Sequence, residues 1–445
     1  MEKSWKEMTA AERRQVRYQR WLFPEGVQFR SAETEDYYKK SVTRFIDALE
    51  MEKLPDRVPC LIIGTFLVPY LYGLTPYEAM YDPDKLIEVN WKYLNDYKPD
   101  HGTGPVVVGS GTVLEIVDYK QYRWAGHGLP KTAAYQAVEG EYMKADEYEA
   151  LIDDPTDFWL RIWMPRAFGA FEGLKEISPF PNLWEIVGVS PQMIPFGIPP
   201  VQKALRAFAD AGDAALPWIQ KMAAFGTESM AMGYTPPFGG VTKAPFDIVA
   251  DTLRGTRGMM LDMYRQPDRV IKAVERLTPL AVRQGVGGSN MSGHPLVFIP
   301  LHKGADGFMS DEQFRKFYWP TLKATILGLV AEGCMPFLFC EGGFNSRLEY
   351  LKELPKASSF WSFDRTDMKK AKETVGIKNC IGGNVPASLM LTGTVDAVGA
   401  YCKDLIDTVG RGGGYIMGLG TALDEGRPDT LHEVIDFTRE YGVYE

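Results

Sequence analysis

Short apolar runs rich in β-branched and aromatic residues alternate with longer segments of helical periodicity from Val58 to the end of the chain. This alternation is typical of a parallel α/β sheet or barrel, because a parallel strand reaches its neighbour through a crossover that is usually a helix. The predicted strands are 58–63, 106–108, 296–301, 336–340, 358–363, 380–383 and 415–419. Between the last five of them we predict helical segments at 311–332, 346–354, 367–375 and 394–409.

Both a (β/α)8 barrel and a doubly wound sheet alternate in this way. A doubly wound sheet that binds a dinucleotide carries GxGxxG after an early strand, and the chain has no such motif there. The glycine-rich run 410–414 precedes a strand rather than a helix, so it lacks the helix N-terminus that binds phosphate and predicts a tight turn. The pattern therefore favours an α/β fold of the TIM-barrel type.

Two regions depart from the alternation. Residues 1–45 are dense in charge with interleaved aromatic residues, and we interpret them as an N-terminal helical arm with a solvated charged face ahead of a barrel at 46–445. Residues 165–240 are rich in Pro, Met and aromatic residues. We predict that they form a lid-like insertion that lines or covers a substrate pocket, with ordinary loop packing as the alternative.

Charge and cysteine usage exclude several classes of protein. Lys plus Arg is 49 and Asp plus Glu is 58, so the net charge of −9 argues against a general nucleic-acid binder. The five cysteines contain no CxxC pair and are too few for a disulfide scaffold. The N-terminus does not resemble a signal peptide and no run approaches 18 uncharged apolar residues. We therefore predict a cytoplasmic protein without a membrane span.

Polar residues that close the predicted strands are the candidates for chemistry, because the active site of such a barrel lies at the C-terminal ends of its strands. His302, Glu341 and Cys380 fit an N/O/S site for zinc with one position open to substrate, and Cys340 and Asp364 are rival ligands. Cys380 could instead be a small buried apolar residue, and His302 could be hydrogen-bonded to a loop. Glu341 closes an apolar strand beside two glycines and needs a partner there.

A series of short signatures, in a fixed order, resembles the uroporphyrinogen decarboxylase superfamily over residues 40–445. These signatures are Ala48-Leu49-Glu50, Pro55-Asp56-Arg57-Val58-Pro59, Tyr81-Asp82-Pro83, Asp154-Pro155, Leu253-Arg254-Gly255, Gln266-Pro267, Met309-Ser310-Asp311-Glu312-Gln313-Phe314, Gly382-Gly383-Asn384-Val385, Leu391-Thr392-Gly393-Thr394 and Gly413-Gly414-Tyr415-Ile416. The resemblance implies a distorted (β/α)8 barrel.

The sequence departs from both main branches of that superfamily. The decarboxylases carry an Arg-rich N-terminal signature that is absent here, and residues 60–70 offer no cation for a tetrapyrrole with eight carboxylates. The zinc methyltransferases carry a His-x-Cys motif and a late Gly-Cys-Gly turn. Here these positions read Phe339-Cys340-Glu341 and Gly418-Leu419-Gly420. The chain looks more like the divergent branch that includes methyltransferases of anaerobic O-demethylase systems.

That resemblance implies transfer of a methyl group from a methoxylated, aromatic small-molecule donor to the Co(I) corrinoid of a partner protein. The chain has no DxHxxG cobalamin sequence, so the cobalamin must come with the corrinoid protein. Zinc, as a Lewis acid hardened by His and Glu ligands, would assist departure of the phenolate. The implied site residues are Glu341 and Asp364 for catalysis, His302, Glu341, Cys380 and Cys340 for the metal, and Tyr234, Phe238, Trp361 and Asn384 for the substrate.

Two other functions compete with this one. A decarboxylase or lyase of a small carboxylated substrate would use Asp364 and Arg365 without a metal. A non-catalytic metabolite-binding barrel would have lost the metal ligands, as Phe339 and Leu419 suggest. The sequence does not identify the methyl donor, and it is compatible with a homodimer.

Overall fold

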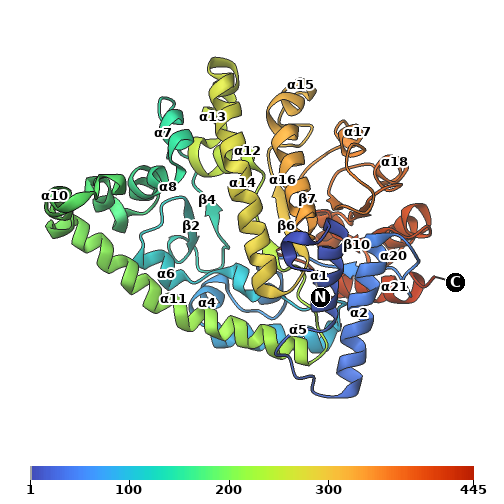
Figure 1. The fold of residues 1–445 in the computed structure, drawn as a ribbon. Helices are drawn as coiled ribbons and strands as arrows, with labels where there is room; N and C mark the ends of the chain where they lie inside the picture. Colours follow the sequence, from blue (N-terminus) through green and yellow to red (C-terminus); the bar gives the residue numbers. More distant parts are fainter. Residues whose placement is uncertain (1–2, 445) are drawn as a thin grey trace.

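Seven parallel strands curl into one sheet in the order β1-β10-β9-β8-β7-β6-β5, in a computed structural model that describes residues 3–444 (Figure 1). A small second sheet has the order β3-β2-β4. The strands are β1 (Cys60–Leu61), β2 (Tyr122–Ala125), β3 (Gly128–Leu129), β4 (Gln136–Ala137), β5 (Gly240–Val241), β6 (Leu296–Leu301), β7 (Met335–Cys340), β8 (Phe360–Phe363), β9 (Cys380–Gly382) and β10 (Tyr415–Gly418). The α/β prediction of a distorted TIM barrel is confirmed.

Helices surround the curled sheet, as Figure 1 shows. They are α1 (Ala10–Leu22), α2 (Ala32–Glu50), α3 (Leu67–Leu71), α4 (Pro76–Tyr81), α5 (Pro83–Tyr97), α6 (Gly111–Ile116), α7 (Tyr148–Asp153), α8 (Pro155–Phe158), α9 (Met164–Ala167), α10 (Glu185–Gly197), α11 (Pro199–Ala231), α12 (Pro245–Asp247), α13 (Gly255–Arg265), α14 (Pro267–Ser292), α15 (Asp311–Gln313), α16 (Trp319–Ala331), α17 (Leu348–Leu351), α18 (Met368–Thr374), α19 (Ala387–Thr392), α20 (Val395–Leu405) and α21 (Pro428–Tyr441).

The strands are apolar along their whole length because both faces of the sheet are covered. In β7 every residue is buried, and successive side chains point to opposite faces. Phe337 and Phe339 pack with the aromatic residues of α1 and α2 inside the curl, whereas Leu338 and Cys340 pack under the outer helices. A continuous run of apolar residues is therefore what the fold requires at this position.

Helices α1 and α2 close the N-terminal end of the curled sheet. Tyr18, Trp21 and Phe45 from these helices share one buried cluster with Met335 and Phe360, the first residues of β7 and β8. Thr9 caps α1 in a capping box with Glu12, which fixes where the helix begins. The N-terminal arm is thus part of the barrel core rather than a separate appendage.

The predicted solvated face of α1 is wrong for Arg14 and Arg17, which are buried. The Arg17 guanidinium donates to the carbonyl oxygen of Glu332 at 2.8 Å, to Ser289 Oγ at 2.8 Å and to Asn290 Oδ1 at 2.9 Å. A buried guanidinium is tolerated when its donors are paired, and here they join α1 to α14 and to the C-terminal end of α16.

The place of an eighth strand, between β1 and β5, is filled by a segment without strand geometry. Asp100 Oδ2 accepts the backbone N–H of Cys60 and His101 Nε2 accepts that of Ile62, each at 2.9 Å. On the other side the Gly102 N–H donates to the carbonyl oxygen of Thr235 at 2.6 Å. Side chains therefore satisfy the open edge of β1, where a strand would have used its carbonyl groups.

The predicted strand 106–108 is wrong, because Pro105–Val108 forms a 3-10 helix. Pro105 occupies its first turn, and Gly109 ends it with a φ of 76°. Proline has no N–H to donate to a neighbouring strand, and it favours the first turn of a helix. The flanking proline and glycine therefore outweigh the β propensity of the three valines.

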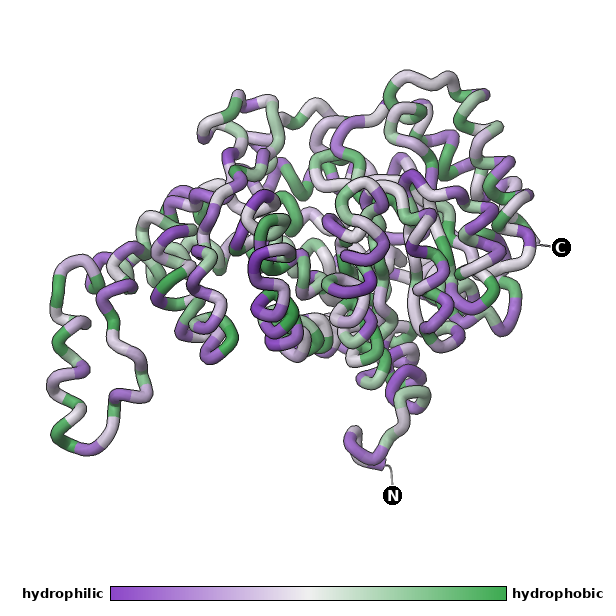
Figure 2. Tube along the Cα trace, turned by 90° about the horizontal axis from the view of Figure 1, so that it is seen from above, coloured by the Kyte–Doolittle hydropathy of each residue, from purple (hydrophilic) through white to green (hydrophobic). Residues whose placement is uncertain are grey.

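Residues of the predicted insertion at 165–240 form short helices and a long hairpin of α10 and α11, which projects from the barrel in Figures 1 and 2. No residue of α10 is buried, and Ile186 is 91% exposed. Only Pro237 and Phe238 of this region line the cavity described below. Within residues 3–444 no helix is both long and apolar enough to span a membrane.

Candidate active site

The C-terminal ends of β6 to β9 place four predicted side chains at one edge of the sheet. His302 follows β6, Glu341 follows β7, Asp364 follows β8, and Asn384 lies beyond β9. The register pairs the last residues of β6, β7 and β8, so Glu341 lies between His302 and Asp364. The side chains predicted from the strand ends therefore lie together at the C-terminal edge of the sheet, where barrel sites are built.

His302 lies between two carboxylates. Its Nδ1 is 2.6 Å from Asp251 Oδ2, and its Nε2 is 3.6 Å from Glu341 Oε1. The Asp251 contact assigns the proton on Nδ1 to that bond and turns Nε2 toward Glu341. The row Asp251, His302, Glu341 can therefore hold and pass a proton.

Two lysines neutralise Asp251. Lys243 Nζ lies 2.7 Å from Asp251 Oδ2, and Lys303 Nζ lies 3.4 Å from Asp251 Oδ1. Burial alone would raise the pKa of Asp251, but the bonds to His302 and Lys243 outweigh it and hold the pKa well below its ordinary value. Asp251 is therefore a permanent negative charge beside His302.

The protonated form of His302 is favoured in this setting. Burial lowers the pKa of its imidazole, but the hydrogen bond and charge of Asp251, with smaller contributions from Asp247 and Glu341, raise the pKa above its ordinary value. His302 consequently carries a positive charge further into the neutral pH range than a free histidine.

Asp247 fixes the backbone that carries His302. Its Oδ2 accepts the His302 N–H at 3.0 Å and the Tyr318 hydroxyl at 2.8 Å, and its Oδ1 accepts the Lys303 N–H at 3.2 Å. Burial, reinforced by the charge of Asp251, raises the pKa of Asp247 to about 6. Asp247 and Asp251 lie four residues apart across α12 and a π-helical turn, a local geometry common at functional sites.

Glu341 is the ionisable group that faces the open space. Burial raises the pKa of its carboxyl, against the opposing effect of His302. The next residue, Gly342, has a φ of 93°, which favours glycine, and its N–H donates to Asp364 Oδ2 at 3.0 Å. Burial also raises the pKa of Asp364, whose neighbour Arg365 turns into solvent. Asp364 thus supports the turn that presents Glu341.

A cavity of about 280 Å³ opens above this edge. Its wall is mostly apolar, and Glu341 is its only carboxylate from residues 3–444. The lining residues are Ile62, Ile63, Gly64, Thr65, Leu67, Val68, Pro69, Leu86, Asn90, Tyr93, His101, Gly102, Thr103, Gly104, Pro105, Val107, Val108, Pro237, Phe238, Phe298, Pro300, Phe339, Glu341 and Ala422. Such a cavity suits a small, largely apolar ligand with a polar group near Glu341.

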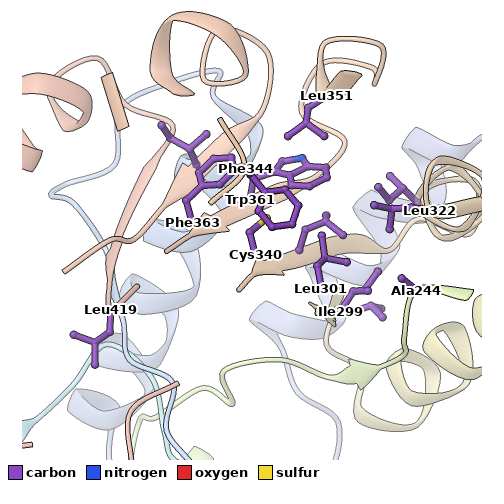
Figure 3. Packing of buried hydrophobic residues seen from close by; sticks show 14 of the residues in the cluster. Ala244, Ile299, Leu301, Leu322, Cys340, Phe344, Leu351, Trp361, Phe363 and Leu419 are labelled. Atoms are coloured by element: carbon purple, nitrogen blue, oxygen red, sulfur yellow. The ribbon is translucent and has the colours of Figure 1, made fainter. Parts of the chain in front are cut away.

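The two predicted cysteine ligands lie away from His302 and Glu341. Cys340 belongs to the buried cluster outside the sheet, beside Trp361 and Phe344 (Figure 3). Cys380 is level with Phe337 through the pairing with Phe360, four residues before Glu341, which is about 13 Å along the strand direction. Burial raises the pKa of both thiols, which disfavours the thiolate that binds metal.

The structure brings only two of the predicted zinc ligands, His302 and Glu341, close to each other. His302 and Glu341 lie close enough to share one ion, and Asp251 holds the far ring nitrogen of His302 as metal-bound histidines require. Catalytic zinc ordinarily takes three protein ligands. Among residues 3–444 no group of three His, Cys, Asp or Glu side chains could hold a metal ion, so the described residues do not complete the site.

The four predicted substrate residues are dispersed. Phe238 lines the cavity. Trp361 is buried in the core and donates its ring N–H to Ser359 Oγ at 2.9 Å. The Tyr234 hydroxyl donates to the carbonyl oxygen of Leu94 at 2.9 Å. The Asn384 amide donates to the backbone oxygen of Asp364 at 2.7 Å, so Asn384 holds a loop rather than facing the cavity.

Several residues of the site were not predicted from the sequence. Asp251, Asp247 and Lys243 follow β5, a two-residue strand that is too short to show an alternating pattern. Thr103 and Asn90 line the cavity from the segment that replaces the eighth strand and from α5. The only local signal for the first group was the spacing of two aspartates four residues apart, which is typical of one helix face.

Comparison with known proteins adds family information to this geometry. The family model described as Uroporphyrinogen decarboxylase (URO-D) matches residues 191–441, more than half of the chain. No curated protein sequence matches the chain. Among solved structures, a methyltransferase from Methanosarcina mazei superposes with a TM-score of 0.57 at 16% identity, over 91% of this chain and 98% of that chain. At that identity the likeness concerns the fold. With this fold and a family model that spans more than half of its length, the chain belongs to the uroporphyrinogen decarboxylase (URO-D) family.

Proposed function

We propose that the protein is a methyltransferase that moves a methyl group from a methoxylated aromatic compound to the Co(I) corrinoid of a partner protein. The observation that carries the proposal is the row Asp251, His302, Glu341, which ends at the wall of an apolar cavity. The fold shared with the Methanosarcina mazei methyltransferase supports it.

The chain contributes a proton to the leaving group in this reaction. The corrinoid supplies the nucleophile that attacks the methyl carbon, with the electron pair of the broken C–O bond staying on the ether oxygen. Glu341, with a raised pKa, donates a proton to that oxygen, so the product leaves as a phenol. His302 lies 3.6 Å from Glu341 and can return a proton to it, while the fixed charge of Asp251 keeps His302 in its protonated form.

The apolar cavity holds the methyl donor and excludes water from it. Phe238, Phe298 and Phe339 lie in its wall and offer ring faces to an aromatic ligand. The 3-10 helix at its rim exposes Val106 and Val107, 46% and 42% accessible. An apolar rim of this kind suits the approach of a partner that carries a large, flat cofactor.

Leaving-group dependence tests the role of Glu341. Glu341→Gln removes the proton donor, so methyl transfer from 4-methoxyphenol should fall about 10²- to 10³-fold. Transfer from 4-nitroanisole, whose phenolate leaves without a proton, should fall less than about tenfold. The measurement is the loss of Co(I) cobalamin absorbance, and Glu349→Gln, on an exposed carboxylate of α17, is the control. Equal losses for the two donors would contradict proton donation by Glu341.

Zinc is an alternative to proton donation by Glu341, because a carboxylate that binds a metal ion carries no proton. His302 and Glu341 would supply two of its ligands. Metal content of the purified protein and of Glu341→Gln, by plasma emission spectroscopy, tests it. Near one zinc per chain, lost in the variant, would support a zinc site at this edge. Absence of metal from an active protein would remove zinc and leave proton donation by the chain.

A further inference from the structure

We infer that the cavity selects neutral methoxyarenes over carboxylated ones. This inference rests on the proposed function for the methoxy group, and it concerns the remainder of the substrate. It depends on the charges of the cavity wall.

No cation lines the cavity among the described residues. Its wall contains neither Lys nor Arg, and Glu341 is its one acidic side chain. His101 is the only other ionisable group of the wall besides Tyr93. Its Nδ1 contacts the carbonyl oxygen of Gly102 at 2.6 Å and its Nε2 accepts the Ile62 N–H, which assigns the neutral ring. A carboxylate in this cavity would lose water without gaining a positive partner.

The polar side chains of the wall other than Glu341 are neutral. Asn90 and Tyr93 line the cavity from α5, three residues apart and so on one helix face, and Thr103 lines it from the segment beside β1. The wall therefore offers polar contacts to a neutral ligand but no positive charge to a carboxylate.

Binding of matched ligands tests the charge preference without any methyl transfer. We would titrate the full-length protein with 3-methoxyphenol and with 3-methoxybenzoate at pH 7.5, by ligand-observed NMR in the absence of the corrinoid protein. The neutral ligand should bind at least tenfold more tightly. Equal binding of the benzoate, or tighter binding of tetramethylammonium than of the phenol, would overturn the inference.

A cation introduced at the rim should reverse the preference. Val107 lines the cavity, and its neighbour Val106 in the same 3-10 helix does not. Val107→Arg should therefore tighten binding of 3-methoxybenzoate at least tenfold, whereas Val106→Arg adds the same charge outside the cavity and should change it less than twofold. A similar gain in both variants would show a general charge effect and contradict selection by the wall.

The proposed function and the inference about the cavity can be contradicted separately. Selective binding of 3-methoxyphenol without methyl transfer to Co(I) cobalamin would leave the cavity inference intact and contradict the proposed function. Methyl transfer from 3-methoxybenzoate with an affinity equal to that of the phenol would support the function and overturn the inference.

Discussion

The imidazole of His302 is the residue on which the electrostatics of the site converge. The charges that face it come from three segments. Lys243, Asp247 and Asp251 lie in the turn after β5, Lys303 is the next residue after His302, and Glu341 lies at the end of β7. Because the pKa of His302 is raised in the folded protein, its protonated form stabilises the fold. This contribution is full below the unfolded value near 6.5 and is lost as the pH rises through the raised folded value.

Asp251→Asn should flatten that dependence. The variant removes the charge that raises the pKa of His302, so its urea unfolding midpoint should fall less than that of the wild type as the pH rises from 6 to 8.5. We expect a difference on the order of 1 kcal/mol. Asp213→Asn, on the exposed side of α11, is the control. Parallel curves for the wild type and Asp251→Asn would show that Asp251 does not set the charge of His302.

At the scale of the elements, the filled gap between β1 and β5 is the feature that distinguishes this barrel. Asp100 is buried and pairs with Arg44 Nη1 at 2.9 Å and with Arg57 Nη1 at 2.9 Å, in addition to the Cys60 N–H. Burial would raise the pKa of Asp100, but these partners outweigh it and hold the pKa below its ordinary value. One side chain thus ties α2 to the edge of β1.

Asp100→Asn should destabilise the protein by about 3 to 5 kcal/mol, because it removes the counter-charge of Arg57 and leaves Arg44 with Asp56 alone. His101→Phe removes one neutral acceptor from the same edge and should cost only about 1 to 3 kcal/mol. Urea unfolding midpoints of the two variants measure the difference. A smaller loss in Asp100→Asn than in His101→Phe would contradict the importance of charge at this edge.

The helices and strands of the C-terminal half could be predicted because the spacing of apolar residues indicates which side chains are buried. The strand 296–301 and the helix ends near Glu332 and Val375 follow from the sequence within a few residues. The predicted strand 58–63 contains β1, whereas β5, which has only two residues, was not predicted. The segment at Asp100 that takes the place of the eighth strand makes its bonds with side chains. No residue pattern reports such contacts, because they join positions about 40 residues apart.

The candidate site shows the same limit. Strand ends identified His302 and Glu341, since a polar residue after an apolar run is visible locally. The face on which a cysteine lies depends on register, and one residue of difference moves Cys340 from the site to the core. Arg17 was likewise predicted to lie on a solvated face. Its hydrogen-bond acceptors lie about 270 to 320 residues away in the sequence, and no local pattern indicates them.

For the whole molecule, α10 is the part of the hairpin of α10 and α11 that packing supports least, since α11 buries residues such as Trp218 and Phe225. α10 contains Pro191 and Pro195 and buries none of its side chains. Limited digestion with chymotrypsin should therefore cut first between residues 180 and 198, at Phe180, Leu183, Trp184 or Phe196. First cleavage elsewhere would show that this hairpin is covered in solution, as in the homodimer that the sequence leaves open.

The N-terminal helices have a consequence for synthesis on the ribosome. Several groups that pair with Arg13, Arg14 and Arg17 of α1 lie at positions 289 to 357, and β1 pairs with β10. At roughly 5 to 20 residues per second, α1 is made about 15 to 60 s before these partners. The apolar faces of α1 and α2 therefore stay without their partners from β6, β7 and β8 during that time, and holding them apart from other chains is a task for the cell.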